Sequence, residues 1–250
     1  MVKSRLWARI NWWLVRDVAW IIAIMVGVTF VVATGIGWYQ QGSWPGRVTM
    51  KQLGAVGVAS VVTVQNVAFA LLAWWRTRTV DELGITPQWY TLMLWSVIGV
   101  PLVLVGNIMV GLVFALFGLQ QNQAASYPLV AGDYTGQLIF WCAAALVAPL
   151  GEELLFRGYL WGALQRQYGV WWAVCVSAVL FALGHSTAAS QGALVLVSQT
   201  LIMGLMLAWL RHQSGSIWAG VIAHSMNNSI ALAIVTYCTN HPTSGCALSG

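Results

Sequence analysis

Long apolar stretches separated by short polar segments dominate this chain. Residues 18–46, 52–75, 83–132 and 167–210 contain no Asp, Glu, Lys or Arg. Each stretch exceeds the roughly 20 residues that a helix needs to cross a bilayer. Because backbone polar groups in lipid must be hydrogen-bonded within their own segment, these stretches are predicted to be helices.

The pattern predicts an all-α, polytopic transmembrane bundle of about seven helices with an intramembrane active site. The expected crossings are residues 18–39, 53–75, 92–118, 137–157, 170–186, 193–210 and 216–236. We see no internal repeat and no linker, so the chain is expected to form one membrane domain. Its predicted parts are N-terminal transmembrane helices (1–136), catalytic-core helices (137–236) and a short C-terminal tail (237–250).

Composition supports a membrane protein and argues against a soluble one. Of the 250 residues, 59% are hydrophobic and only 7% are charged, with a mean hydropathy of +0.76, whereas soluble domains carry about 25% charged residues. The basic, Trp-rich start is followed by an apolar run too long for a signal-peptide core, so an uncleaved first span is expected. Eleven scattered Lys and Arg residues form no basic face. We therefore expect contact with membrane lipids and not with nucleic acid.

The distribution of Lys and Arg predicts a cytoplasmic N-terminus in a cell (inner) membrane. With that orientation nine basic residues fall on the inner side and two on the outer side. The inner set is Lys3, Arg5, Arg9, Arg16, Arg76, Arg78, Arg157, Arg166 and Arg211, and the outer set is Arg47 and Lys51. Estimated depths of the polar residues along the spans favour a site that opens toward the cytoplasm.

The four cysteines divide between spans and tail. Cys238 and Cys246 fall outside the membrane on this topology and could form a disulfide in an oxidising compartment. Cys142 and Cys175 lie within spans, where packing as small buried side chains is expected.

A charged cluster, Ala148-Pro-Leu-Gly-Glu-Glu-Leu-Leu-Phe-Arg-Gly158, interrupts the fourth predicted span. Charged side chains inside a membrane cost about 2.5–3.5 kcal/mol each on insertion scales, so each needs a reason. Glu153 and Arg157 are four residues apart, hence on one helical face, and are predicted to neutralise each other. Glu152 is rotated by about 100° and has no partner in its segment. An unpaired carboxylate in such a place suits general acid–base chemistry.

Two further polar groups interrupt apolar helices. His224 and Asn228 repeat the four-residue spacing, and His185 follows Phe181 by one turn. Each His alone could simply bond a carbonyl of a neighbouring helix. Together with Glu152 they form a hydrolytic set, since Glu and His can activate water while His and Asn can donate to an oxyanion. His212 and His241 lie in loop and tail and are left out. Ser225 and Asn227 are left out because they are judged to face away from His224.

These residues resemble the motifs of the CPBP intramembrane protease family, also called the CAAX-protease or Abi family. It includes type 2 CAAX prenyl endopeptidases and lysostaphin-resistance-protein-A-like proteins. The family pattern EExxxR, FxxxH and HxxxN matches Glu152 to Arg157, Phe181 to His185 and His224 to Asn228, in that order. The resemblance covers about residues 137–232 and implies a CAAX-prenyl-protease-2-like intramembrane endopeptidase.

The resemblance also implies roles for the motif residues. Glu152 would activate water with His185, and His224 with Asn228 would stabilise the tetrahedral oxyanion. Glu153, Arg157 and Phe181 would support the site. Either no metal or a single zinc ion is compatible with this set. In the metalloprotease alternative the ligands would be Glu152, His185 and His224, three protein ligands with an open position for water.

The substrate class and two other functions stay open at this point. The substrate could be a prenylated peptide, a leader peptide or another membrane-embedded protein. A non-catalytic bacteriocin-immunity or scaffold protein that keeps the protease fold is the first alternative. A transporter with a Glu/His ion path is the second, although such proteins commonly show inverted repeats, and none is visible here.

Overall fold

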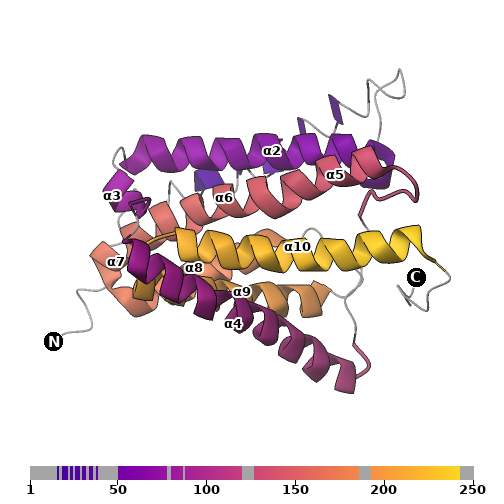
Figure 1. Cartoon of the computed structure of the whole chain (residues 1–250). Helices are drawn as coiled ribbons and strands as arrows, with labels where there is room; N and C mark the ends of the chain where they lie inside the picture. The colour runs from indigo at the N-terminus through magenta and orange to yellow at the C-terminus, as the bar shows by residue number, and fades with distance from the viewer. Residues whose placement is uncertain are drawn as a thin grey trace.

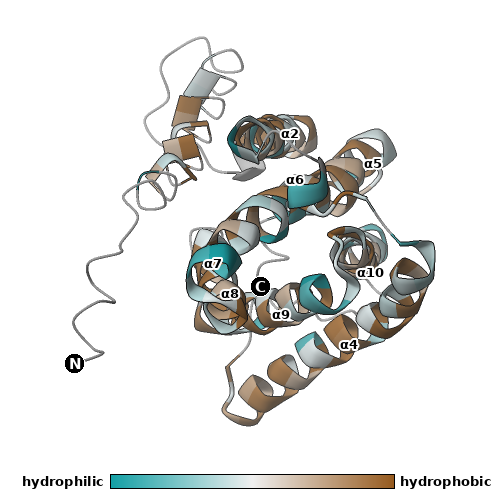
Figure 2. Ribbon diagram, turned by 90° about the vertical axis from the view of Figure 1, so that its left-hand side faces the viewer, coloured by the Kyte–Doolittle hydropathy of each residue, from teal (hydrophilic) through white to brown (hydrophobic). Residues whose placement is uncertain are grey.

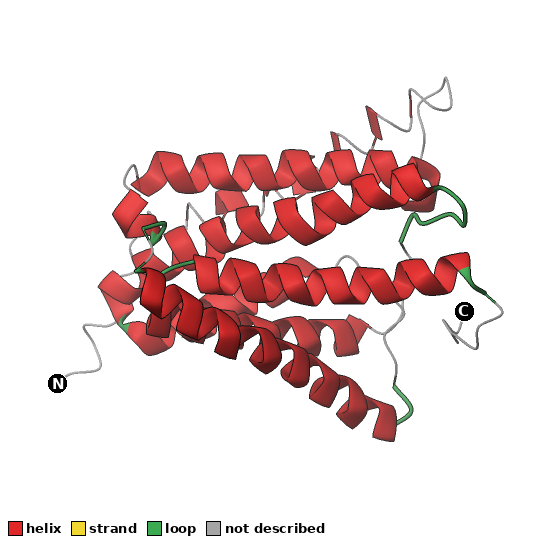
Figure 3. Ribbon diagram, in the orientation of Figure 1, coloured by secondary structure: helices red, strands yellow, loops and turns green. Residues whose placement is uncertain are grey.

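The computed structural model describes parts of residues 16–38 and then residues 50–77, 80–86, 88–119, 127–185 and 193–242. Within these ranges every regular element is a helix, which confirms the all-α fold class (Figure 3). Slightly more than half of the first predicted span, 18–39, is described, and those residues are helical. Cys238 is disulfide-bonded, but Cys246 lies outside the described residues, so its pairing with Cys238 stays a prediction. Cys142 and Cys175 are free thiols. The expectation that both are buried is wrong for Cys175, which is exposed on the outer face of its helix.

The helices follow one another with short connections. Their bounds are α2 Met50–Thr77, α3 Val80–Leu83, α4 Trp89–Leu116, α5 Tyr134–Cys142, α6 Ala148–Glu153, α7 Trp161–Tyr168, α8 Val170–His185, α9 Ala193–Ser214 and α10 Trp218–Asn240. Two π-helical segments, η4 Ala143–Val147 and η5 Leu154–Leu160, join α5, α6 and α7 into one continuous rod.

Five helical stretches of the described chain are long and apolar enough to cross a membrane. They are Leu53–Thr77, Trp89–Leu116, Tyr134–Tyr168, Leu194–Ser214 and Trp218–Asn240. Helix α8, Val170–His185, is apolar but shorter. The predicted span 137–157 is thus only part of a rod that continues to Tyr168, because the charged cluster lies inside the helix and does not end it.

Helix α10 runs through the middle of the bundle. In Figure 1, α2 and the α5–α6 rod lie on one side of it, while α4, α8 and α9 lie on the other. Figure 2, which views the helices nearly end-on, shows the same arrangement and the mainly apolar ribbon of α4. Helix α9 packs against both α8 and α4, and α10 packs against α4. The first motif lies on α6 and η5, the second on α8 and the third on α10 itself.

Glycines bring α4 close to α9. A Cβ on Gly99 would lie 2.7 Å from the Leu210 side chain, and one on Gly106 would clash with Met206. Small residues permit this close approach of membrane helices. The approach sets the position of the wall that α4 and α9 contribute to the site.

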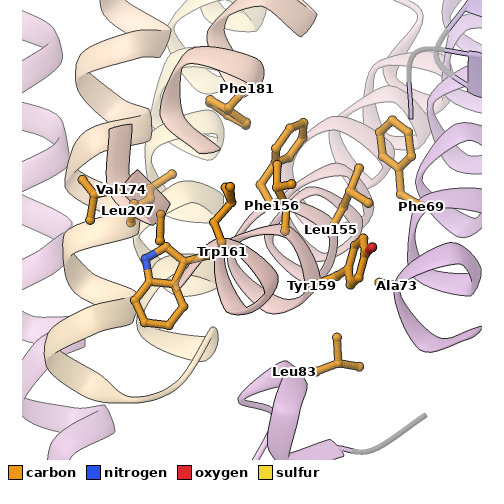
Figure 4. Close-up of a cluster of buried hydrophobic side chains, with 14 of the residues drawn as sticks. Phe69, Ala73, Leu83, Leu155, Phe156, Tyr159, Trp161, Val174, Phe181 and Leu207 are labelled. Atoms are coloured by element: carbon orange, nitrogen blue, oxygen red, sulfur yellow. The ribbon is translucent and has the colours of Figure 1, made fainter. Parts of the chain in front are cut away.

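A hydrophobic cluster packs the end of the bundle at which α3 and α7 lie. Figure 4 shows Phe69 and Ala73 of α2, Leu83 of α3, and Leu155 and Tyr159 of η5 within it. These side chains are 0–6% exposed. Packing of this density holds α2 against the rod. The motif-bearing helices are therefore fixed at one end, while the polar residues gather nearer the other.

Candidate active site

A cavity of about 360 Å³ lies between the helices, near the middle of the bundle and toward the end that carries Tyr127. Its volume is at the lower end of the range of small-ligand pockets. The lining residues are Val58, Val62, Gln65, Asn66, Asn107, Tyr127, Phe140, Ala144, Ala148, Glu152, His185, Leu196, Gln199, Thr200, Met203, His224, Asn227, Asn228, Ala231 and Leu232. All four residues expected to perform chemistry, Glu152, His185, His224 and Asn228, are among them.

Glu153 and Arg157 form a sealed ion pair beside this cavity. Arg157 Nη1 donates to Glu153 Oε1 at 3.0 Å, and both side chains are fully buried. Arg157 Nη2 also donates to the carbonyl of Gly204 on α9 at 3.0 Å, and the guanidinium lies 4.5 Å from the ring centroid of Phe181. The pairing expected from the four-residue spacing is present, and it ties the rod to α9 and α8.

Glu152 occupies a different environment from its neighbour. Its side chain is 13% exposed and faces the cavity, where Oε2 lies 3.8 Å from His224 Nε2. The helical rotation between consecutive residues separates the two carboxylates as expected. Only Glu152 is therefore in a position to meet a molecule in the cavity.

His224 lies between the two carboxylates. Its Nδ1 is 3.4 Å from Glu153 Oε1, while its Nε2 faces Glu152. Because a carboxylate accepts, the Nδ1 contact places a proton on that nitrogen. The ring of Phe181 packs edge-on against the imidazole with centroids 5.7 Å apart. These contacts fix the ring so that Nε2 is the atom offered to the cavity.

His185 ends α8 and lines the same cavity. Its Nδ1 lies 2.9 Å from the carbonyl of Phe181, one turn earlier, and its ring contacts the Phe181 ring with centroids 4.6 Å apart. A carbonyl can only accept, so Nδ1 donates and Nε2 carries the lone pair in the neutral ring. Phe181 therefore orients both imidazoles.

Asn228 is held by a carbonyl that the rod leaves free. In the π-helical register of η4, the Ala148 N–H donates to Ala143, and the next donor along, at position 149, is missing because that residue is Pro. The carbonyl of Ala144 accepts instead from Asn228 Nδ2 at 3.0 Å. The Pro149 position thus produces no break in the rod, but it creates an acceptor that positions the amide.

Asn227 belongs to the site, and its exclusion from sequence is wrong. It lines the cavity, and its Nδ2 lies 3.3 Å from Asn228 Oδ1. A residue three positions after His224 lies only about 60° around the helix, so it shares the His224 face. Asn227 Oδ1 in turn accepts from Asn107 Nδ2 on α4 at 2.8 Å. A chain of amides therefore connects α4 to Asn228.

Other amides in the cavity wall were also missed from sequence. Asn66 is 3% exposed and lines the cavity from α2, and Gln199 Nε2 donates to the Asn107 carbonyl at 3.4 Å. Isolated amides in apolar helices were the available signal, since they are costly in lipid unless they face the bundle interior. No motif spacing marks them, because they come from helices that precede or separate the motifs.

Tyr127 lines the cavity from the connection between α4 and α5. The residue is partly exposed, but burial of its phenol, which packs against Phe140, raises its pKa to about 12. The hydroxyl is therefore protonated at neutral pH and is a neutral donor at this end of the cavity.

The proposed zinc ligands do not form a ready-made set. Across the described residues, no three His, Cys, Asp or Glu side chains are grouped to hold one metal ion. His185 uses Nδ1 on its own helix, and Glu152 and His224 are 3.8 Å apart at their nearest polar atoms. The single-zinc alternative, with Glu152, His185 and His224 as the ligands, therefore stays a prediction.

Two of the arginines counted for orientation are structural. Arg157 is fully buried, and Arg211 is 7% exposed, donates to the Arg157 carbonyl at 3.1 Å and packs over Trp161. Without these two arginines, seven basic residues fall on the inner side and two on the outer side, so the excess of Lys and Arg on the inner side persists. The cavity is lined from the middle of α2 and α10, the end of α8 and the first half of α9, whereas Arg76 and Arg166 lie in the last turns of α2 and α7. The expectation of a cytoplasmic opening is not supported.

The fold and the site define a class: a multi-pass helical membrane protein whose polar cavity holds one carboxylate, two imidazoles and an amide. Comparison with known proteins agrees with this. Residues 134–230 match the family model described as type II CAAX prenyl endopeptidase Rce1-like. The match includes all three motifs, Glu152 to Arg157, Phe181 to His185 and His224 to Asn228, and so confirms the resemblance seen in them.

Curated relatives point the same way. The chain is 25% identical over 158 residues to the "Putative membrane peptidase YdiL" of Bacillus subtilis, which covers 63% of this chain and 59% of the relative. It is 31% identical over 99 residues to the "UPF0177 protein YxdF" of Lactococcus lactis, covering 38% of this chain and 51% of the relative. The chain thus spans little more than half the length of either relative. No solved structure matches the chain significantly.

Proposed function

We propose that this protein is an intramembrane endopeptidase that hydrolyses a peptide bond of a membrane-associated or lipid-linked substrate. One observation carries the proposal. Of two adjacent carboxylates in an apolar rod, Glu153 is buried and neutralised by Arg157, whereas Glu152 faces a cavity that also holds two imidazoles and an amide. A membrane protein that needed only a structural ion pair would have no use for the second carboxylate.

In the proposed reaction, Glu152 is the general base. Glu152 and the lone pair of His185 Nε2 hold a water molecule, and Glu152 takes a proton as the water oxygen bonds to the scissile carbonyl carbon. The carbonyl π electrons move to oxygen and give a tetrahedral oxyanion. When that intermediate collapses, the C–N bond breaks and the proton on Glu152 passes to the leaving amine.

His224 and Asn228 stabilise the oxyanion in this scheme. His224 Nε2, when protonated, and the second N–H of Asn228 Nδ2 both face the cavity. Preorganised donors of this kind are each worth about 2.7–4 kcal/mol in other hydrolases. Asn227 and Asn107 act as positioning residues, since their hydrogen bonds fix which end of the Asn228 amide donates.

The proposal also covers the membrane location, the orientation and the substrate class. We place the protein in the cell membrane with a cytoplasmic N-terminus on the Lys and Arg bias. The cavity then lies toward the non-cytoplasmic half. A prenylated CAAX tail is the substrate suggested by the name of the matching family, and a leader or membrane peptide is the alternative.

Replacing Glu152 tests the proposal. Membranes from cells that produce the wild type, Glu152→Gln or Glu82→Gln are compared for peptides released during incubation. Glu82 is an exposed carboxylate on α3 and is the matched control. We expect the Glu152→Gln pattern to equal that of cells without the protein, and the Glu82→Gln pattern to equal the wild type.

The immunity or scaffold alternative makes the opposite prediction. It requires Glu152→Gln to keep full biological activity at normal expression. Peptide release by the wild type that persists in Glu152→Gln would also refute the proposed role of this carboxylate.

A further inference from the structure

Gly220 is buried on α10, one helical turn before His224. Residues four apart share a face of a helix, so Gly220 is directed toward the same neighbours as the imidazole. A Cβ on Gly220 would lie 2.7 Å from Glu153 Oε2 and 3.4 Å from Glu153 Cδ. The first distance is well inside the optimal separation of two non-bonded atoms. The Glu153 carboxylate therefore lies in space that a side chain at position 220 would fill.

A glycine at this point of α10 needs a reason, because glycine is among the poorest helix formers. Gly220 lies within the helix and is not one of the described glycines with a positive φ. An alanine could adopt the same backbone conformation, so conformational freedom does not explain the residue. The missing side chain does explain it, because the Glu153 carboxylate takes its place.

The two oxygens of Glu153 have different surroundings. Oε1 accepts from Arg157 Nη1 at 3.0 Å and lies 3.4 Å from His224 Nδ1. Oε2 is buried and has no hydrogen-bond partner among the described residues. No hydrogen bond in this part of the chain therefore resists a push on Oε2, but both oxygens are bonded to Cδ and move together. A side chain at position 220 would thus displace Oε1 as well.

Displacement of Oε1 would change the orientation of His224. Within the described part of the chain, Glu153 Oε1 is the one hydrogen-bond partner of His224 Nδ1. The edge-on contact with Phe181 is apolar and does not distinguish the two ring nitrogens. Glu152 Oε2, at 3.8 Å from Nε2, is too far away for a hydrogen bond. Without Oε1 in place, the imidazole can turn and take Nε2 away from the cavity.

We propose that Gly220 is a positioning residue for His224. Its missing side chain admits the Glu153 carboxylate, and Glu153 Oε1 in turn holds the His224 ring with Nε2 toward the cavity. The expected effect on turnover rests on the proposed peptidase function. The expected effect on the His224 ring does not depend on that function.

The test compares Gly220→Ala with Gly99→Ala in the full-length protein. In both variants the new Cβ would lie 2.7 Å from the end of a buried side chain, Glu153 in one and Leu210 in the other. Neither Gly99 nor Leu210 lines the cavity, so Gly99→Ala reports the effect of crowding alone. We expect both variants to elute as folded protein in size-exclusion chromatography in detergent.

The first readout is the ring N–H signal of His224 in protein labelled with ¹⁵N-histidine. His224→Gln identifies this signal among those of the four histidines. We expect a wild-type Nδ1–H signal protected from exchange with water, because the ring is buried and donates to Glu153. Gly220→Ala should shift or abolish the signal, and Gly99→Ala should leave it unchanged. His185 Nδ1, which donates within α8, is the internal reference.

The second readout is peptide release by membranes that contain each variant. The rate should fall at least about 10-fold in Gly220→Ala and stay within about two-fold of the wild type in Gly99→Ala. Should Gly220→Ala fail to fold, Glu153→Asp is added to it, because the shorter side chain withdraws the carboxylate from the new Cβ. This double variant should fold without recovering the His224 signal.

A wild-type His224 signal in either Gly220→Ala protein, an equal change in Gly99→Ala, or a wild type without a protected Nδ1–H signal would overturn the inference. So would unchanged peptide release by a folded Gly220→Ala, or misfolding of both Gly220→Ala proteins, because the glycine would then serve packing alone. A signal that changes only in Gly220→Ala, in a protein whose wild type releases no peptide, refutes the peptidase and leaves the orientation of His224 by Gly220 and Glu153 intact. Peptide release by the wild type with an unchanged signal in Gly220→Ala refutes the positioning role and leaves the peptidase intact.

Discussion

Breaking the Glu153–Arg157 pair should strongly destabilise the folded protein, whereas changing Glu152 should not. In Arg157→Met the Glu153 carboxylate remains fully buried and loses the cation 3.0 Å away. Removing one partner of a buried pair costs about 3–5 kcal/mol, because an uncompensated charge remains. The hydrogen bond to the Gly204 carbonyl is also lost.

The magnitude can be checked by heating. For a chain of this size each kcal/mol changes the unfolding temperature by about 2–4 °C, so Arg157→Met should lower it by about 6–20 °C. Unfolding is followed in detergent by fluorescence-detected size-exclusion chromatography after heating. The exposed Arg166 on α7 supplies the control; Arg166→Met should change the free energy of unfolding by no more than about 0.5 kcal/mol.

A double replacement makes the reasoning sharper. Arg157→Met with Glu153→Leu removes both charges and should recover most of the lost stability, since apolar replacement of a buried pair is often neutral. Glu152→Gln should unfold within about 2 °C of the wild type, because Glu152 is 13% exposed and is not part of the pair. A double variant no more stable than Arg157→Met, or a wild-type-like Arg157→Met, would refute the structural role.

Two further predictions concern backbone and site. Gly84 (φ +69°) and Gly118 (φ +71°) both have left-handed conformations, but a Cβ on Gly84 would lie 2.6 Å from the Arg211 guanidinium while one on Gly118 would meet nothing. Gly118→Ala should cost about 1–2 kcal/mol and Gly84→Ala clearly more, measured by the same heating assay; equal losses would contradict the contact. Asn227→Leu should lower kcat by about 10-fold with KM unchanged. This is expected when the misorientation of a donor that acts only in the transition state raises the activation free energy by about 1.4 kcal/mol. A change in KM alone would instead indicate that Asn227 binds substrate and does not position Asn228.

Much of the fold could be predicted from the sequence because membrane helices have a local signal. Charge-free stretches of sufficient length require helices in lipid, and this holds whatever the neighbours are. The separation of Glu152 from Glu153 was also local, since it depends only on the 100° rotation per helical residue. The motif residues and their faces were therefore accessible before any tertiary structure.

Residues outside the motifs were not accessible in this way. Asn107 stands alone in an apolar helix, and only the packing of α4 against α10 brings it to Asn227. The free carbonyl of Ala144 depends on the π-helical register of η4, which no side-chain pattern announces. The helical face of Asn227 was a local property, and that error came from treating a three-residue separation as an opposite face.

The sequence by itself determined that the chain is a helical membrane protein with one neutralised and one unneutralised carboxylate, because helix formation and side-chain direction depend on residues within a few turns. Only the tertiary structure decided that Glu152, His185, His224 and Asn228 line one cavity, and that amide side chains from other helices share its wall. The reason is physical: which helices meet, and at what register, depends on glycine contacts and side-chain packing between segments far apart in the chain, as in the Asn107–Asn227 hydrogen bond, which joins residues 120 positions apart.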